Sequence, residues 1–175
     1  MQRYAYVAHM EPTRASSNLS SRQSQEIFLD LNDESGRGKV LIAAGFIDQQ
    51  LRDVLAAFMF NNKSATALLG VDAPLGSLNA RIAACHALGL ISDIEKHDLT
   101  ILRKIRNEFA HHIEASFDLP KIRDLCRSLC MKAPEHVTEV MGKTGEFESS
   151  AIITTLANRP HYVGLQRRKV QDWPH

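Results

Sequence analysis

The amino-acid sequence predicts an all-α fold, a bundle of five to six helices with flexible termini. Apolar residues recur every three to four positions over long segments, which is the spacing that buries one face of a helix. Runs that alternate apolar and polar residues, as strands do, are too short to predict a sheet. With 175 residues, of which 44% are hydrophobic, the chain has the size of one domain around a single core.

The helical domain is expected to span residues 23–158. Residues 1–22 are rich in Ser, Arg, Asn and Gln and hold too few apolar side chains to offset the entropy of ordering, so a flexible N-terminal arm is expected. Residues 159–175 contain Pro, Arg and Lys with weak periodicity, and they are expected to form a basic C-terminal tail.

A short helix is expected over residues 25–33, followed by a long one over 36–60. The long helix has a stripe of apolar residues at helical spacing that would face the core. The members of this stripe are Val40, Ala43, Ala44, Ile47, Leu51, Val54, Leu55 and Phe58. Residues 61–63 interrupt the helix, and residues 70–76 are expected to form a loop because they are rich in Gly and include a Pro.

The next helix is expected to start at residue 77 or 78 and to end where Gly89 provides a C-terminal cap. Hydrophobic side chains around this turn suggest that it is buried. They are Leu88, Leu90 and Ile91.

Ser92 marks the clearest helix start in the chain. It is a favourable N-cap residue, and Glu95 three positions later completes the capping-box pattern. This helix is expected to reach about His112 and to form the antiparallel centre of the bundle with the helix over 36–60. Its expected buried stripe consists of Ile94, Ile101, Leu102, Ile105 and Phe109.

Two further helices are expected in the C-terminal part. Asp118 is a possible N-cap of the first, which has Pro120 in its first turn. The second is expected over residues 135–158, with Gly142 and Gly145 as interruptions.

The charge and the hydropathy of the sequence limit the classes of binding partner that can be expected. The 21 basic and 20 acidic residues leave a net charge of +1, so any nucleic-acid or membrane binding would need a local patch. The sequence shows no signal-peptide pattern and no apolar run of about 18 residues, which favours a cytoplasmic protein without a membrane partner.

The three cysteines, Cys85, Cys126 and Cys130, lack the spacing of a disulfide framework and are expected to be reduced core residues. Cys126 and Cys130 lie four apart, and several histidines could join them. Their spacing fits no common zinc signature, so no metal and no cofactor are expected.

The most chemically suggestive segment is residues 106–112, at the end of the helix that Ser92 starts. On an ideal helix, Arg106 and His111 point about 140° apart, whereas Asn107 and His111 share a face. The arginine and the histidine could converge only if the helix breaks at residues 109–110, or if a two-fold dimer brings two such helix ends together. A functional interpretation therefore predicts a homodimer.

These residue types suit metal-independent RNA cleavage. A guanidinium is a planar fork for a phosphate, and an imidazole can move a proton to or from the ribose 2′-hydroxyl or the leaving oxygen. The alternative is structural, because basic residues favour the negative end of a helix dipole. Arg81, Arg103 and His112 are further candidates for anion binding, although Arg81 could instead pair with Asp72 or Asp98.

Three stretches in order resemble the mannitol operon repressor family, MltR. They are Asp72–Arg81, Ala87–Ile91 and Arg103–His111, and the similarity extends over about residues 28–133. The last stretch also resembles the R-x4-H motif of the HEPN superfamily of helical domains, which includes ribonucleases and non-catalytic members. This resemblance implies a HEPN-like bundle in which Arg106 and His111 are the candidate catalytic pair and Asn107 a supporting polar residue.

Two functions therefore remain open. The family resemblance implies a regulator of gene expression, and no short turn followed by an exposed basic recognition helix is found, which argues against direct sequence-specific DNA binding. Such a regulator would act through a protein or nucleic-acid partner, with RNA or a protein as the partners expected. The alternative is a HEPN-type, metal-independent endoribonuclease, a toxin or RNA-processing effector, that uses Arg106 and His111.

Overall fold

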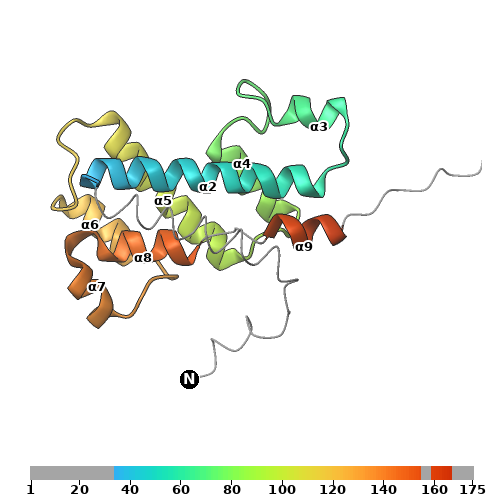
Figure 1. Ribbon diagram of the computed structural model, residues 1–175. Coiled ribbons are helices and arrows are strands. Elements are labelled where there is room, and N and C mark those ends of the chain that lie inside the picture. Colours follow the sequence, from blue (N-terminus) through green and yellow to red (C-terminus); the bar gives the residue numbers. More distant parts are fainter. Residues whose placement is uncertain (1–33, 155–158, 167–175) are drawn as a thin grey trace, which may run out of the picture.

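The computed structural model describes residues 34–154 and 159–166, and these form helices joined by loops (Figure 1). The predicted all-α class is confirmed for this part of the chain. The short helix expected over 25–33, the N-terminal arm and the end of the tail lie outside the described residues. In the described ranges, no helix combines the length and the apolar character needed to cross a membrane.

Helix α2 (Gly36–Phe58) runs through the middle of the molecule (Figure 1). Its first turn is capped by Ser35, whose Oγ accepts the Gly38 N–H at 3.1 Å. The predicted apolar stripe is buried along its whole length except for Phe58, which is partly buried. The helix ends at Phe58, two residues earlier than expected. The chain becomes extended at Met59, so the stripe stops there.

Helix α5 (Asp93–His111) packs against α2 in the antiparallel sense. Arg37, at the start of α2, contacts the carbonyls of Phe109 and His112 at the end of α5. The predicted capping box is present, with Glu95 N–H bound to Ser92 Oγ at 3.2 Å and Ser92 N–H bound to Glu95 Oε2 at 2.7 Å. The expected antiparallel centre is therefore confirmed.

One residue of the buried stripe expected for α5 is exposed, so the prediction is wrong for that residue. Ile94 is 53% exposed, because the face defined by Leu102 and Ile105 continues toward the start of the helix through Asp98 and Glu95. Those two polar side chains are buried because each accepts backbone N–H groups.

Helix α4 (Leu78–Ala87) precedes α5 and ends as predicted, with Gly89 at φ +69° just beyond its last turn. Leu90 and Ile91 are buried, but Leu88 is 45% exposed, so the expected burial holds for two of the three hydrophobic residues at this turn. A further short helix, α3 (Lys63–Leu68), was not predicted. Asn62 starts it, since its side chain accepts the Ala65 N–H at 2.9 Å.

Helix α6 (Pro120–Arg127) begins at the predicted proline, but Asp118 does not cap it. The Asp118 carboxylate instead pairs with Lys143 at 2.6 Å. The last predicted helix is divided into α7 (Glu135–Met141), a 3-10 turn (Gly142–Thr144) and α8 (Gly145–Ile153). Gly142 has φ +79°, a backbone conformation that a side chain would strain, and this is where α7 ends.

Helix α9 (Arg159–Gln166) corrects the expectation of a tail beginning at residue 159. It packs along the second half of α2, and Val163 is 4% exposed. Arg159 binds the Leu90 carbonyl at 3.1 Å and forms an ion pair with Glu95. The weak apolar periodicity of residues 159–166 gave no sign of this helix, which is held by its packing along α2 and by Arg159.

Candidate functional site

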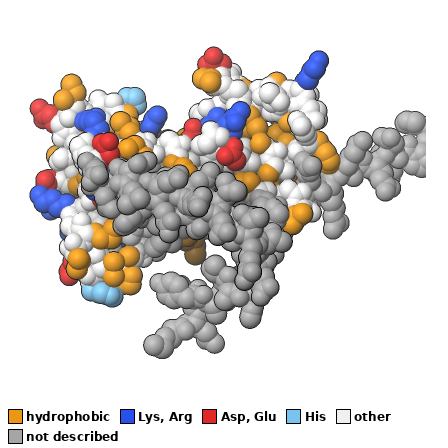
Figure 2. Space-filling view, viewed as in Figure 1, with side chains coloured by type: hydrophobic (Ala, Val, Ile, Leu, Met, Phe, Trp, Pro, Cys, Tyr) orange, Lys and Arg blue, Asp and Glu red, His pale blue; other side chains and the backbone are white. Residues whose placement is uncertain are grey.

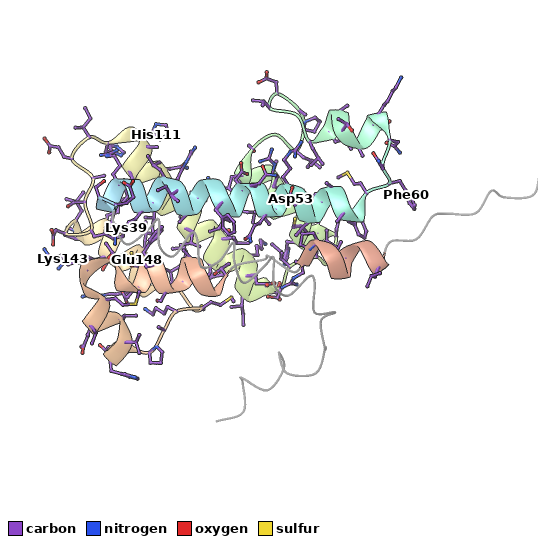
Figure 3. The ribbon with its side chains drawn as sticks, viewed as in Figure 1. Lys39, Asp53, Phe60, His111, Lys143 and Glu148 are labelled. Carbon is purple, nitrogen blue, oxygen red and sulfur yellow. The ribbon has the colours of Figure 1, made fainter. Side chains whose placement is uncertain are left out.

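The end of α5 presents three basic side chains to solvent. Arg106, His111 and His112 are exposed, and Asn107 is half-buried between them. Arg106 Nη1 donates to Asn107 Oδ1 at 3.1 Å, so the amide oxygen orients the guanidinium. Figure 3 shows His111 above the first turns of α2.

Helix α5 is unbroken through residues 109 and 110. On a regular helix, side chains five residues apart point about 140° away from each other. Within the described residues, no hydrogen bond joins Arg106 to His111. One of the two routes by which the pair could converge, a helix break, is therefore removed, and a second copy of the chain is the route that remains.

The end of α5 is held by Arg37 from α2. Its guanidinium donates to the Phe109 carbonyl, to the His112 carbonyl at 2.8 Å and to the Ile113 carbonyl at 2.7 Å. The last carbonyls of a helix have no partner within it, and a cation favours the negative end of the helix dipole; the His112 carbonyl also accepts the Ala115 N–H at 3.1 Å. Arg37 therefore holds the backbone on both sides of His111 in place.

Phe109 anchors the same segment in the core, and the Arg37 guanidinium lies 5.9 Å from the centre of its ring. It is 1% exposed, and its ring lies 5.0 Å from the ring of Phe117, which in turn lies 5.6 Å from that of Phe147 in α8. The motif therefore has one face buried in an aromatic cluster and another face free.

Glu108 connects the end of α5 with α6. Lys121 donates to Glu108 Oε1 at 2.6 Å, and His112 Nδ1 lies 3.6 Å from Glu108 Oε2. The hydrogen bond from Lys121 lowers the pKa of the Glu108 carboxyl, and the charges of Lys121, His112 and His111 act in the same direction.

The other candidate binding residues are placed differently. Arg81 is 6% exposed, pairs with Asp48 at 2.6 Å and donates to the Leu75 carbonyl at 2.9 Å, so its partner is neither Asp72 nor Asp98 as expected. This pairing locks α4 onto α2 and occupies the guanidinium. Arg103 is half-buried, and its Nε is buried without a hydrogen-bond partner among the described residues.

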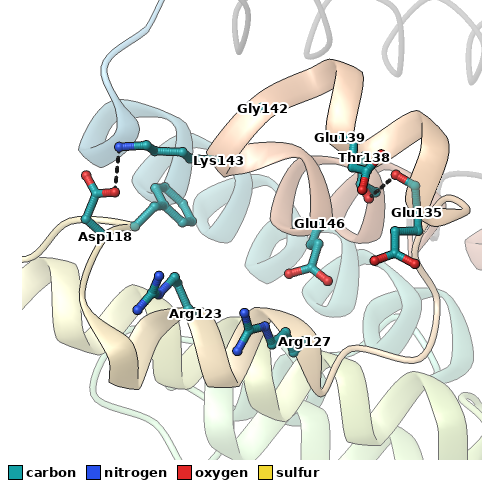
Figure 4. A pocket seen from close by; sticks show the side chains of 10 residues that line it. Asp118, Arg123, Arg127, Glu135, Thr138, Glu139, Gly142, Lys143 and Glu146 are labelled. Atoms are coloured by element: carbon teal, nitrogen blue, oxygen red, sulfur yellow. Dashed lines mark hydrogen bonds and ion pairs between the residues drawn. The ribbon is translucent and has the colours of Figure 1, made fainter.

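A pocket of about 320 Å³ lies between α6 and the α7–α8 unit (Figure 4). Arg123 and Arg127 line one wall, and acidic side chains including Glu135, Glu139 and Glu146 line the other. Sequence reasoning missed this pocket. The available signal was the four-residue spacing of the two arginines and of the first two glutamates, which puts each pair on one helix face.

The cysteines divide into two classes. Cys85 and Cys126 are buried as predicted, but Cys130 is exposed, because α6 ends at Arg127 and leaves it in the following loop. Cys130 lies close to His97 and Asp98, with one potential metal-binding atom of each within 4.8 Å of the others. Sequence spacing did not reveal this group, because Cys130 lies more than 30 positions after His97 and Asp98.

The surface around these sites has no uniform charge. On the face drawn in Figure 2, basic, acidic and histidine side chains are interspersed at the end of the molecule where Figure 1 places α6 and α7. Lys39 and Glu148 form an ion pair of 2.7 Å between α2 and α8 at the same end (Figure 3). The described part of this face therefore lacks the broad basic field that favours nonspecific nucleic-acid binding.

Two solved structures have a similar fold. The X-ray structure of the MtlR-HPr complex from Escherichia coli contains a chain with a TM-score of 0.53 and 18% identity, matched over 81% of this chain and 96% of that one. A possible transcriptional regulator, YggD from Shigella flexneri 2a, matches with a TM-score of 0.57 and 14% identity over 81% and 95% of the two chains. No protein-family model and no curated protein matches the sequence. The predicted resemblance to the mannitol operon repressor is thus confirmed at the level of the fold.

Proposed function

We propose that this chain is a regulator of gene expression that acts by binding a protein partner. The observation that supports the proposal best is a fold shared, over nearly the whole length of the neighbours, with the MtlR-HPr complex and with a possible transcriptional regulator. The partner proposed for this chain is a protein of the HPr type, by analogy with the neighbouring complex.

The arrangement of the helices argues against a direct reading of DNA. A recognition helix must expose one face to enter the major groove. Helix α5 packs against α2, α4 and α6, and its exposed side runs along the whole helix but is acidic and apolar at the start, at Asp93 and Ile94, and basic only further on. The described helices therefore offer contacts for a partner at the end of α5, but no element with the geometry of a recognition helix.

The proposed contact surface is the end of α5 with the residues that follow it. Ile113 is 94% exposed there, beside the exposed His111 and His112. An apolar side chain surrounded by groups that can be charged is the composition of a protein contact with a polar rim. The basic groups would complement an acidic or phosphorylated partner surface.

Titration calorimetry with HPr from the same organism tests the proposal. Ile113→Asp and His111→Ala are each expected to weaken binding at least tenfold, about 1.4 kcal/mol. The matched control is Val71→Asp, at an 88% exposed residue near α3, and it is expected to bind as the wild type does. Absence of binding, or binding insensitive to both substitutions at the end of α5, would contradict this proposal.

A second test is genetic. Deletion of the gene is expected to change expression of neighbouring operons, and the Ile113→Asp allele is expected to reproduce that change. Unaltered transcript levels in the deletion strain would contradict the proposed regulatory role.

A metal-independent endoribonuclease is the second candidate, and one observation favours it. Arg106, Asn107 and His111 are all accessible at a helix end that Arg37 holds in place. Because α5 is unbroken, the arginine and the histidine would act together only across a homodimer, which this candidate function therefore requires.

The ribonuclease candidate predicts RNA fragments with cyclic phosphate ends in the presence of a chelator. Arg106→Ala and His111→Ala are expected to abolish cleavage singly. A mixture of the two variants is expected to recover part of it, because a mixed dimer restores one complete pair. Equal RNA survival with wild type and both variants would exclude this activity, as would a monomer by light scattering at working concentration.

A further inference from the structure

The loop after α6 is fastened to the first half of α5 by one buried carboxylate. Asp98 is fully buried, and its Oδ1 accepts the Cys130 N–H at 2.9 Å while its Oδ2 accepts the Met131 N–H at 2.6 Å. These bonds hold the carboxylate in one position and bring residue 130 of the loop against the helix. Each carboxylate oxygen has two lone pairs, so the bond to Oδ1 leaves a second acceptor site on that atom.

Two exposed side chains flank this fixed carboxylate. His97 precedes Asp98 on the helix, and its Nε2 lies 3.1 Å from the Ser128 carbonyl oxygen, within the same loop. The thiol of Cys130 lies 3.9 Å from that same oxygen. One nitrogen, one oxygen and one sulfur donor, from His97, Asp98 and Cys130, lie within 4.8 Å of each other.

We propose that His97, Asp98 and Cys130 form a zinc-binding site. Zinc is bound by imidazole nitrogen, carboxylate oxygen and thiolate sulfur at about 2.0 to 2.3 Å, so tetrahedral ligand atoms lie about 3.5 Å apart. The exposed His97 and Cys130 can close the remaining gap by rotation, since the solvent side of both is free. Three protein ligands leave the fourth position to water.

The donor set selects zinc over hard cations. Calcium and magnesium are bound by oxygen ligands, six or more for calcium, and this group offers only one carboxylate together with nitrogen and sulfur. On binding, the Cys130 thiol gives its proton to solvent. The thiolate and the Asp98 carboxylate then balance the two positive charges of the ion, so the completed site is neutral.

Zinc binding through Nε2 of His97 would replace the contact of this nitrogen with the Ser128 carbonyl oxygen. Either ring nitrogen of His97 can take the metal while the other keeps the proton. The N–H groups of residues 130 and 131 continue to hold the carboxylate from behind, as the outer-shell contacts of zinc ligands commonly do.

The site is independent of the function proposed above. His97 precedes His111 by 14 residues, which is about 21 Å along a helix. Zinc would fasten the loop between α6 and α7 to α5, and it would not touch the exposed residues at the end of that helix. The zinc site can therefore be tested without any assumption about a protein partner or an RNA substrate.

Titration of the reduced full-length chain with cobalt(II), followed by zinc, tests the proposal. One equivalent of cobalt is expected to give visible bands of a tetrahedral ion and a thiolate-to-cobalt charge-transfer band, and zinc is expected to displace both. Cys130→Ser is expected to remove the charge-transfer band, and His97→Gln to weaken binding at least tenfold. Because both side chains are exposed, circular dichroism is expected to show that the variants remain folded.

His86→Gln provides the matched control. His86 lies on α4 and pairs with Asp93 at 2.8 Å, outside the group, so this variant is expected to bind as the wild type does. A spectrum without a thiolate band would overturn the proposal. A band that survives in Cys130→Ser, or binding lost in His86→Gln but retained in His97→Gln, would overturn it as well.

Discussion

The chemistry of each cysteine follows from its burial. Burial raises the pKa of Cys85 to about 12, against the opposing charge of Arg159, and raises the pKa of Cys126 to about 12 as well. Both thiols are therefore neutral in the physiological range, and the thiolate is the reactive form. Cys130 is the exposed member of the three cysteines.

We therefore expect one rapidly reacting thiol per native chain with Ellman's reagent, and three after denaturation in guanidinium. In Cys130→Ser the rapid phase is expected to vanish, while the two buried thiols still react once the chain is unfolded. Between pH 7 and 9 the buried pair is expected to stay unreactive. Two or more fast thiols in the native protein would contradict this assignment.

The Glu108–Lys121 pair gives a prediction with a defined sign in pH. The hydrogen bond from Lys121 lowers the pKa of Glu108 in the folded chain below its ordinary value of 4.5. A lowered folded pKa means that the pair contributes stability above the unfolded pKa and loses that contribution as the pH falls through the folded value. Lys121→Met is expected to raise the Glu108 pKa toward 4.5, as measured by carboxyl carbon NMR.

Unfolding free energies measured at several pH values provide the control for this pair. The difference in unfolding free energy between wild type and Lys121→Met is expected to shrink as the pH falls below 4.5 and through the lower pKa of Glu108 in the folded wild type, because Glu108 is protonated in both chains only below that value. An unchanged NMR titration curve in the variant would show that Lys121 does not set this pKa.

At the scale of the elements, both ends of α5 are capped by side chains. Ser92 and Glu95 close its start, and Arg159 of α9 adds an ion pair to the same glutamate. Arg37 of α2 closes its end. The sequence pattern predicted the first cap because its residues are three apart, and it could not predict the second, whose members are more than 70 positions apart.

Arg37 is expected to stabilise the fold more than any exposed charge on α5 does. Hydrogen bonds that involve a charged group contribute about 1.5 to 3 kcal/mol, and here one guanidinium serves three carbonyls of which two are partly solvated. Arg37→Ala is therefore expected to lower the unfolding free energy in urea by about 2 kcal/mol. Lys104→Ala, on the exposed face of α5, is the control, with an expected change below about 0.5 kcal/mol. Equal effects of the two substitutions would show that Arg37 does not cap the helix.

At the scale of the molecule, hydrophobic periodicity sufficed to predict the two central helices, because their stripes are long and regular. It failed where a short element is fixed by a few contacts. Helix α3 depends on the Asn62 cap, and α9 depends on Arg159 and Val163. The candidate site shows the same division, because the motif on α5 is local in sequence, whereas the pocket and the group around Cys130 are assembled by tertiary packing.

The contribution of α9 to the whole fold gives the last prediction. Val163 is buried against the bundle, and Arg159 joins α9 to Leu90 and Glu95, next to the start of α5. Burial of a valine side chain contributes about 2 kcal/mol, which corresponds to a shift in Tm of about 4 to 8 °C for a chain of this size. Val163→Ala is expected to lower the Tm by this amount in calorimetry, and truncation after residue 158 by more. Leu165→Ala, at a side chain that is 73% exposed, is the control and is expected to leave the Tm unchanged. A truncated chain with the wild-type Tm would show that residues from 159 onward behave as the tail that the sequence suggests.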